Sequence, residues 1–177
     1  KGILPKRLKA CKIPACSACM FAKATRRQWR TKTSKNNDED FEEIKPGDVV
    51  SVDQMVSPTP GLIAQMIGFL TKKRYKYATV YVNQASRLTF TYLQKTATAD
   101  ETLEGKKAFE AFAATRGVNK IKAYHADNGI FKANAWIENC KEASQPMTFA
   151  GVNAHHQNGI AERKIRDLQE SARAMLL

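Results

Sequence analysis

Three acidic residues stand at positions from which carboxylates could act together in chemistry. Asp53 interrupts an apolar run at 49–55, where an acid is uncommon. Asp127 directly follows a second, apolar-alternating run, and Glu162 falls in the first turn of a predicted helix, where the helix dipole favours an ionised acid. Carboxylate oxygens suit Mg²⁺ or Mn²⁺, and three of them from separate elements can hold two ions about 4 Å apart for phosphoryl transfer.

The same acids also have a purely structural interpretation. Asp127-Asn128-Gly129 is favourable turn chemistry, so Asp127 can simply shape a loop. Spacing along the chain does not by itself show that three carboxylates converge. The interpretation therefore depends on which elements carry the acids and whether those elements meet.

Hydrophobic periodicity predicts these elements. Strands are predicted at 48–55, 76–83, 88–93, 120–126 and 147–150, and helices at about 99–116, at about 134–143 and from 158 to the end. The proline-rich stretch 57–61 is predicted as a loop and 84–87 as the turn of a hairpin. This order predicts an α/β or α+β layer fold, a mixed sheet with helices on its faces.

Apolar residues at helical spacing mark the faces that we expect to be buried. Gly117 is well placed to stop the first helix. The expected core residues of the first two helices are Phe109, Phe112, Ala113, Trp136, Ile137 and Cys140.

The formal net charge of +12 is concentrated at the beginning of the chain. Residues 1–37 contain eleven Lys or Arg and no acid, whereas the remainder is nearly balanced, with 18 basic and 17 acidic residues. A basic arm of this kind usually meets a polyanion, most often nucleic acid, although a solvated tail has the same composition. We predict a basic arm at 1–37, a linker at 38–46 and a globular domain at 47–177.

Cysteine usage and hydropathy indicate where such a chain works. Four cysteines without a secretory feature do not make a disulfide framework, which favours a reducing, intracellular compartment. No run of eighteen apolar residues is present, so we expect no membrane partner. Because the chain starts at Lys1 and ends inside a predicted helix, we expect it to be a fragment of a longer protein.

Three blocks of the sequence together resemble a known family. The blocks "GDVVSVDQM" (47–55), "YHADNGIF" (124–131) and "HHQNGIAERKIRDL" (155–168) look like the signature blocks of integrases from copia-type LTR retrotransposons, in the expected order. The stretch "LPKRLKACKIPACSACMFAKATRRQW" (4–29) resembles the end of the zinc-binding segment that precedes their catalytic core. Asp127 and Glu162 are separated by 34 residues, one fewer than in the best-known retroviral members.

The resemblance implies an RNase H-like fold and a DDE polynucleotidyl transferase. It assigns catalysis and divalent-metal binding to Asp53, Asp127 and Glu162, with Mg²⁺ or Mn²⁺ as the cofactor. Such an enzyme trims the 3′ ends of retroelement DNA, with water as the attacking group, and joins the new 3′-hydroxyl to target DNA. Paired DNA ends need paired active sites, so a homo-oligomer is implied, acting in the host nucleus after a cytoplasmic particle stage.

Residues around the third acid are candidates for contact with DNA. Arg166, Gln169 and Arg173 follow Glu162 by four, seven and eleven positions and so share its helix face, from which they can reach phosphates; Lys164 lies off this stripe. The resemblance adds the loop residues His156, Gln157 and Asn158, and Asn128 beside Asp127. Asn158 is alternatively a helix cap, Asn128 a turn former and Arg166 a surface charge.

The pair Cys16-x-x-Cys19 has the spacing of a metal knuckle, but one pair is half a zinc site. In the resembling integrases two histidines lie upstream, so Cys16 and Cys19 are predicted as zinc ligands whose partners this chain does not contain. Cys11 could substitute as a third ligand.

Two alternatives stay open at this point. One is another RNase H-like nuclease or DNA transposase, against which the block "HHQNGIAER" argues. The other is a nucleic-acid-binding fragment without catalytic activity.

Overall fold

The computed structural model describes residues 16–22, 44–62, 74–151 and 158–176. The chain divides into two compact units, residues 1–36 with 166–177 and residues 37–165, which we describe separately. The described part of the first unit consists of helix α2 (Ser17–Ala22) and the last turns of α5 (Gly159–Leu176). The predicted division into an arm, a linker and a core domain stays a prediction.

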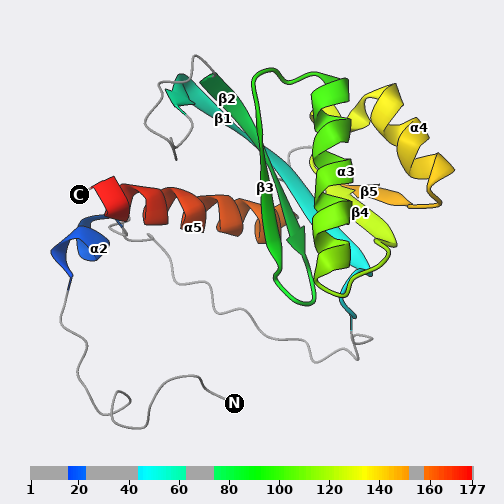
Figure 1. Ribbon diagram of the computed structural model, residues 1–177, viewed down its shortest axis with the longest axis horizontal. Helices are drawn as coiled ribbons and strands as arrows, with labels where there is room; N and C mark the ends of the chain where they lie inside the picture. Colours follow the sequence, from blue (N-terminus) through cyan, green and yellow to red (C-terminus); the bar gives the residue numbers. More distant parts are fainter. Residues whose placement is uncertain (1–15, 23–43, 63–73, 152–157, 177) are drawn as a thin grey trace, which may run out of the picture. The chain divides into compact units, whose positions relative to one another are not determined.

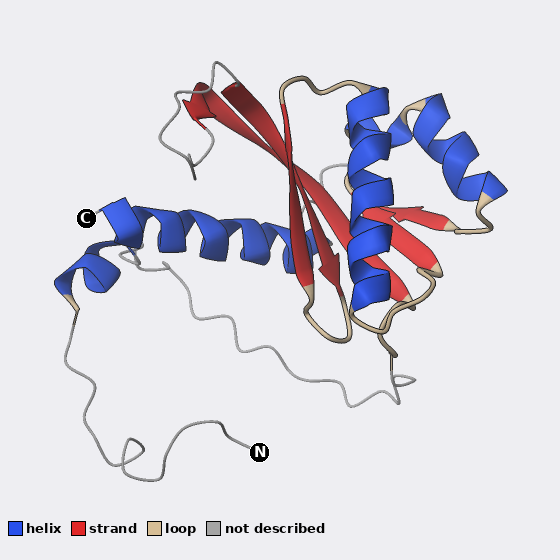
Figure 2. Cartoon of the chain, viewed as in Figure 1, coloured by secondary structure: helices blue, strands red, loops and turns tan. Residues whose placement is uncertain are grey.

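The larger unit is built on a five-stranded mixed sheet with the strand order β3-β2-β1-β4-β5 (Figures 1 and 2). The central strand β1 pairs antiparallel with β2, which pairs antiparallel with β3, whereas β4 and β5 run parallel to β1. The predicted α/β layer fold and the hairpin through 84–87 are confirmed. The strands are β1 (Val49–Leu62), β2 (Arg74–Asn83), β3 (Thr89–Gln94), β4 (Ala123–Ala126) and β5 (Met147–Phe149).

The helices of this unit are α3 (Ala99–Thr115), the short 3₁₀ turn η1 (Ile130–Lys132), α4 (Asn134–Glu142) and the start of α5. Helix α3 begins at Thr98, whose side chain accepts a hydrogen bond from the Glu101 N–H, and it ends before Gly117, which has the positive φ (84°) of a helix stop. None of the described helices is long and apolar enough to cross a bilayer.

One face of the sheet is covered by α3 and α4. Tyr81 of β2 stacks on Phe109 of α3 with ring centroids 4.9 Å apart, and Tyr124 of β4 meets Trp136 of α4 edge to face at 5.9 Å. Of the predicted core residues, Phe112 and Ile137 are only half-buried. The buried cluster consists of Val50, Val52, Tyr81, Phe109, Ala113, Ile121, Tyr124, Ala126, Phe131, Trp136 and Cys140.

A buried network of polar side chains connects β4 to these helices. The Lys106 side chain is 2% exposed, and its Nζ lies 3.1 Å from Glu110 Oε1 and 2.9 Å from Asn139 Oδ1. The same Glu110 oxygen accepts hydrogen bonds from the Tyr124 hydroxyl and from Gln145 Nε2, both at 2.8 Å. The network therefore joins α3, α4 and β4, and it fixes the strand that directly precedes Asp127.

The predicted end of the first strand is wrong. We expected a loop at 57–61, but β1 continues to Leu62, with an irregularity in its register between Val56 and Gly61. Beyond the irregularity Gly61 and Leu62 pair again with β2, which begins at Arg74. The prolines do not end the strand because their fixed φ is compatible with an extended chain, and irregular positions of a strand tolerate the missing N–H.

Candidate active site

Strand register brings Asp53 and Asp127 to neighbouring positions. Val52 of β1 is the parallel partner of Ala126 of β4, and each aspartate is the next residue of its own chain segment. Because neighbouring strands lie about 4.8 Å apart, the two aspartates stand side by side where β4 ends. Val52 and Ala126 are fully buried while both aspartates are half-buried, so the acids face away from the core beneath α3.

Both aspartates hold their carboxylates in the same local way. The Gln54 N–H donates to Asp53 Oδ1 at 2.8 Å, and the Asn128 N–H donates to Asp127 Oδ1 at 2.6 Å. A hydrogen bond from the next residue's backbone N–H turns each carboxylate toward its own main chain. Strand β1 and the end of β4 thus present two carboxylates with matched local geometry.

Asn158 anchors the beginning of α5 to β1. Its side chain is 1% exposed, and its Nδ2 donates to the Val52 carbonyl oxygen at 2.9 Å. Val52 is the residue before Asp53, and Asn158 lies one helical turn before Glu162. A single side chain therefore links the strand of the first acid to the helix of the third.

Asn128 fixes the opposite side of the site. Its Nδ2 donates to the Ala150 carbonyl oxygen at 2.7 Å, and the Ala150 N–H donates to the Ala126 carbonyl at 3.0 Å. These two bonds attach the turn after Asp127 to the end of β5. Both asparagines that the sequence offers as DNA contacts thus donate from their amide nitrogens to backbone carbonyls.

The carboxylates of Asp53 and Asp127 are suitable ligands for a divalent cation, because Mg²⁺ prefers carboxylate oxygens. Among the described residues, however, no three His, Cys, Asp or Glu side chains are grouped closely enough to hold a metal ion together. The structure brings two of the predicted ligands side by side, Asp53 and Asp127. Half-buried Glu162 lies in the first turn of α5 and does not complete a cluster with them.

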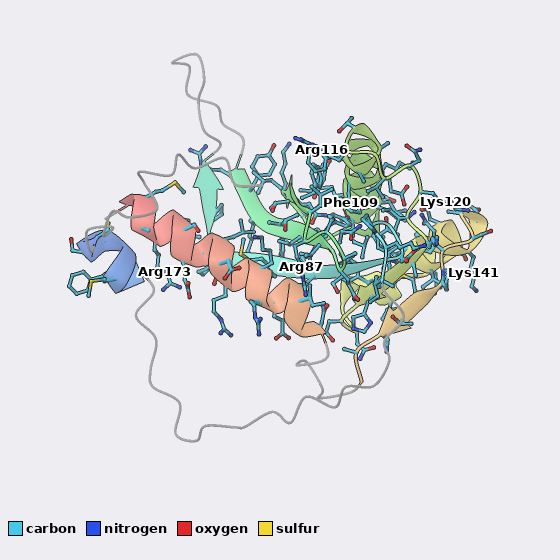
Figure 3. All side chains as sticks on the ribbon, turned by 90° about the horizontal axis from the view of Figure 1, so that it is seen from below. Arg87, Phe109, Arg116, Lys120, Lys141 and Arg173 are labelled. Carbon is cyan, nitrogen blue, oxygen red and sulfur yellow. The ribbon has the colours of Figure 1, made fainter. Side chains whose placement is uncertain are left out.

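The other predicted site residues fall into two groups. His156, Gln157 and Cys11 lie outside the described residues. Arg166, Gln169 and Arg173 are exposed on α5, within the smaller unit, and Arg173 is labelled in Figure 3. Cys16 is exposed directly before α2, and Cys19 lies within that helix. Because the described residues contain no group of three metal ligands, the zinc assignment stays a prediction.

No family model and no curated protein matches this chain. A chain of the simian T-cell lymphotropic virus intasome in complex with PP2A regulatory subunit B56 gamma is similar in structure, with a TM-score of 0.53 and 14% identity over 73% of this chain and 47% of that one. Two structures of the HTLV-2 integrase catalytic core domain in complex with magnesium are also similar. The dimeric form has a TM-score of 0.47 and 16% identity over 70% and 68% of the two chains, and the trimeric form 0.49 and 15% over 75% and 86%.

The similarity to the intasome chain, together with the mixed sheet, confirms the predicted RNase H-like fold. This fold defines the class of protein as an RNase H-like domain. The chain spans about half the length of the intasome chain that it matches.

Proposed function

We propose that this chain is the catalytic core of a divalent-metal-dependent DNA strand transferase, an integrase of a copia-type LTR retrotransposon. The observation that carries the proposal is the register of β1 with β4, which sets Asp53 beside Asp127. The RNase H-like fold and the three sequence blocks that contain Asp53, Asp127 and Glu162 support the same assignment.

The proposed reaction has two steps: water hydrolyses a phosphodiester bond near a 3′ end and leaves a free 3′-hydroxyl, and this hydroxyl then exchanges a phosphodiester bond of the target DNA for a new one, releasing a 3′-hydroxyl of the target strand. Bound Mg²⁺ or Mn²⁺ would supply charge stabilisation for the attacking and leaving oxygens of the phosphoryl group. Asp53 and Asp127 would hold the ions, and Glu162 would join them from α5. The attacking oxygen belongs to water when a 3′ end is trimmed, and to that 3′-hydroxyl when the end is joined to target DNA.

We also propose roles for the remaining side chains near the site. Asn158 and Asn128 position the backbone on either side of the two aspartates. Arg166, Gln169 and Arg173 follow Glu162 along α5 and are proposed to contact DNA phosphates. Assembly as a homo-oligomer on paired DNA ends and action in the nucleus belong to the same proposal.

Metal binding can be tested without catalysis. Mn²⁺ is paramagnetic, so an ion held by Asp53 and Asp127 broadens the amide signals of nearby residues. We expect the Gln54 and Asn128 amides, which donate to these carboxylates, to broaden at low Mn²⁺ concentration. The Asp53→Asn variant keeps an acceptor oxygen for Gln54 and should lose the broadening, whereas Glu138→Gln on the exposed face of α4 should keep it.

Catalysis is tested with a labelled, blunt-ended DNA duplex and a plasmid target. In Mn²⁺ we expect nicking of the duplex ends and transfer of label to the plasmid. Asp53→Asn, Asp127→Asn and Glu162→Gln should each reduce both reactions at least about 100-fold, the scale of removing a group that stabilises transition-state charge. Unchanged activity in these variants would show that the acids are not catalytic, and cleavage without transfer would favour another RNase H-like nuclease.

A nucleic-acid-binding module without catalysis is the second candidate. The observation that favours it is that the described residues contain no preformed group of three metal ligands. It predicts salt-sensitive DNA binding with neither Mn²⁺ broadening nor strand transfer.

A further inference from the structure

Basic side chains of the larger unit line an open pocket of about 490 Å³. Asp53, Asp127 and Glu162 are not among its lining residues. Its lining comes from the turn between β2 and β3, the end of α3, the segment before β1 and the first turns of α5. Among the described residues, its lining contains three cations and no acid. The lining residues are Pro46, Ser86, Arg87, Leu88, Thr89, Arg116, Val118 and Lys164.

Among the described residues, the three cations have no acidic counterpart. Within the described residues, none of Arg87, Arg116 and Lys164 forms an ion pair. Asp48 lies two residues after the lining residue Pro46, but its Oδ1 forms an ion pair with Lys122 Nζ at 2.7 Å. Arg87 and Arg116 are exposed, and both are labelled in Figure 3. Three like charges around one concave surface raise the local potential and attract an anion.

The position of Arg87 is costly for an arginine. Its φ is +58°, in the left-handed region that glycine or asparagine usually occupies. The turn around it is well ordered by hydrogen bonds: Asn83 Oδ1 accepts from the Ala85 and Ser86 N–H groups, and the Arg87 N–H donates to the Asn83 carbonyl at 2.9 Å. A residue whose strained backbone conformation is held in place by several surrounding hydrogen bonds is typical of a functional position.

We infer that this pocket binds backbone phosphates of a DNA duplex, at a place separate from the strand that is cut. The inference rests on the proposed function, and charge complementarity identifies the occupant. Guanidinium groups such as those of Arg87 and Arg116 match phosphate oxygens with paired N–H donors, while Lys164 adds a point charge. Since Lys164 lies two residues after Glu162, DNA at the carboxylates passes close to the pocket.

The decisive variant is Arg87→Gly. It removes the charge and also relieves the left-handed backbone, so the thermal midpoint should be unchanged or higher. Arg116→Gln and Lys164→Gln remove the other two charges without adding volume. Lys141→Gln, an exposed cation of α4 remote from the pocket lining, is the matched control (Figure 3).

Binding of the full chain to a mixed-sequence duplex is measured by fluorescence anisotropy over a series of salt concentrations. Each pocket substitution should reduce the slope of log affinity against log salt by about one, and the triple variant by about three, with weaker binding to every sequence. Lys141→Gln should leave the slope unchanged. If the pocket variants keep the wild-type slope while the wild type binds DNA, the inference is overturned.

The occupant and the proposed function are separated by two further measurements. The side-chain Nε signals of Arg87 and Arg116 should shift on adding duplex at concentrations where inorganic phosphate has no effect. Equal shifts with inorganic phosphate alone would mean a simple anion site and overturn the inference. Loss of Mn²⁺ broadening in Asp53→Asn tests the proposed function independently, because that residue does not line the pocket.

Discussion

Asn158 donates a hydrogen bond from its Nδ2 to the carbonyl oxygen of Val52 at 2.9 Å, across 106 positions of the sequence. The bond is buried, and it connects the helix that carries Glu162 with the strand that carries Asp53. The sequence left two roles open for Asn158, a helix cap or a DNA contact. The structure gives it a third, the attachment of α5 to the central strand.

Asn158→Ala should therefore lower the free energy of unfolding by about 0.5–1.5 kcal/mol, because it removes a buried hydrogen bond between α5 and β1. Urea denaturation measures the change. Asn119→Ala, at an exposed position outside any element, should stay within about 0.5 kcal/mol of the wild type. If Asn158→Ala keeps full stability but weakens DNA binding, the side chain is a DNA contact instead.

A comparable prediction concerns Asn128, on the other side of the site. Asn128→Asp cannot donate to the Ala150 carbonyl, so we expect a loss of about 0.5–1.5 kcal/mol in the free energy of unfolding. Asn128→Ala should give a similar loss. Amide hydrogen exchange at Ala150 should accelerate in both variants, and unchanged exchange would show that the bond does not hold the end of β5.

Gly105 should resist the usual stabilising effect of alanine in a helix. A Cβ at this position would lie 2.9 Å from Tyr92 Cδ1 and 3.0 Å from the Tyr81 hydroxyl. Gly105→Ala is therefore expected to reduce the free energy of unfolding by about 1–3 kcal/mol through overpacking, rather than raise it by about 1 kcal/mol. Thermal denaturation of the variant, with Lys107→Ala on the exposed side of α3 as control, decides between these outcomes.

Tyr124 should make the fold sensitive to alkaline pH. Burial, reinforced by the nearby Glu110 carboxylate, raises the pKa of Tyr124 far above its ordinary value of 10.0. Above pH 10.0 the unfolded chain releases this proton, whereas the folded chain retains it. The contribution of Tyr124 to the free energy of unfolding is therefore complete below pH 10.0 and falls as pH rises, by up to about 1.4 kcal/mol per pH unit.

Tyr124→Phe removes this contribution and costs about 0.5–1.5 kcal/mol near neutral pH for the lost bond to Glu110. The free energy of unfolding, followed by denaturant titration on either side of pH 10.0, should fall less steeply with pH in the variant. An identical pH slope in the two proteins would show that Tyr124 does not control the alkaline transition.

Much of the architecture followed from local patterns. Alternation in β2, β3 and β4 and the spacing of Phe109 and Ala113 predicted strands and helices whose ends differ by only a few residues from those observed. The sequence does not predict the end of β1, because its prolines favour a loop, whereas pairing of Gly61 and Leu62 with β2 continues the strand. Pairing with a partner outweighed local propensity there.

The sequence by itself determined which residues can act as ligands and which elements carry them, because residue type and periodicity are local properties. It identified Asp53, Asp127 and Glu162, and placed each at a strand or at a helix start. Only the tertiary structure decided that Asp53 and Asp127 are neighbours, since this depends on the pairing of Val52 with Ala126 across the sheet. It alone also gathered Arg87, Arg116 and Lys164 around one pocket, because residues from three distant segments become a common surface only when the chain folds.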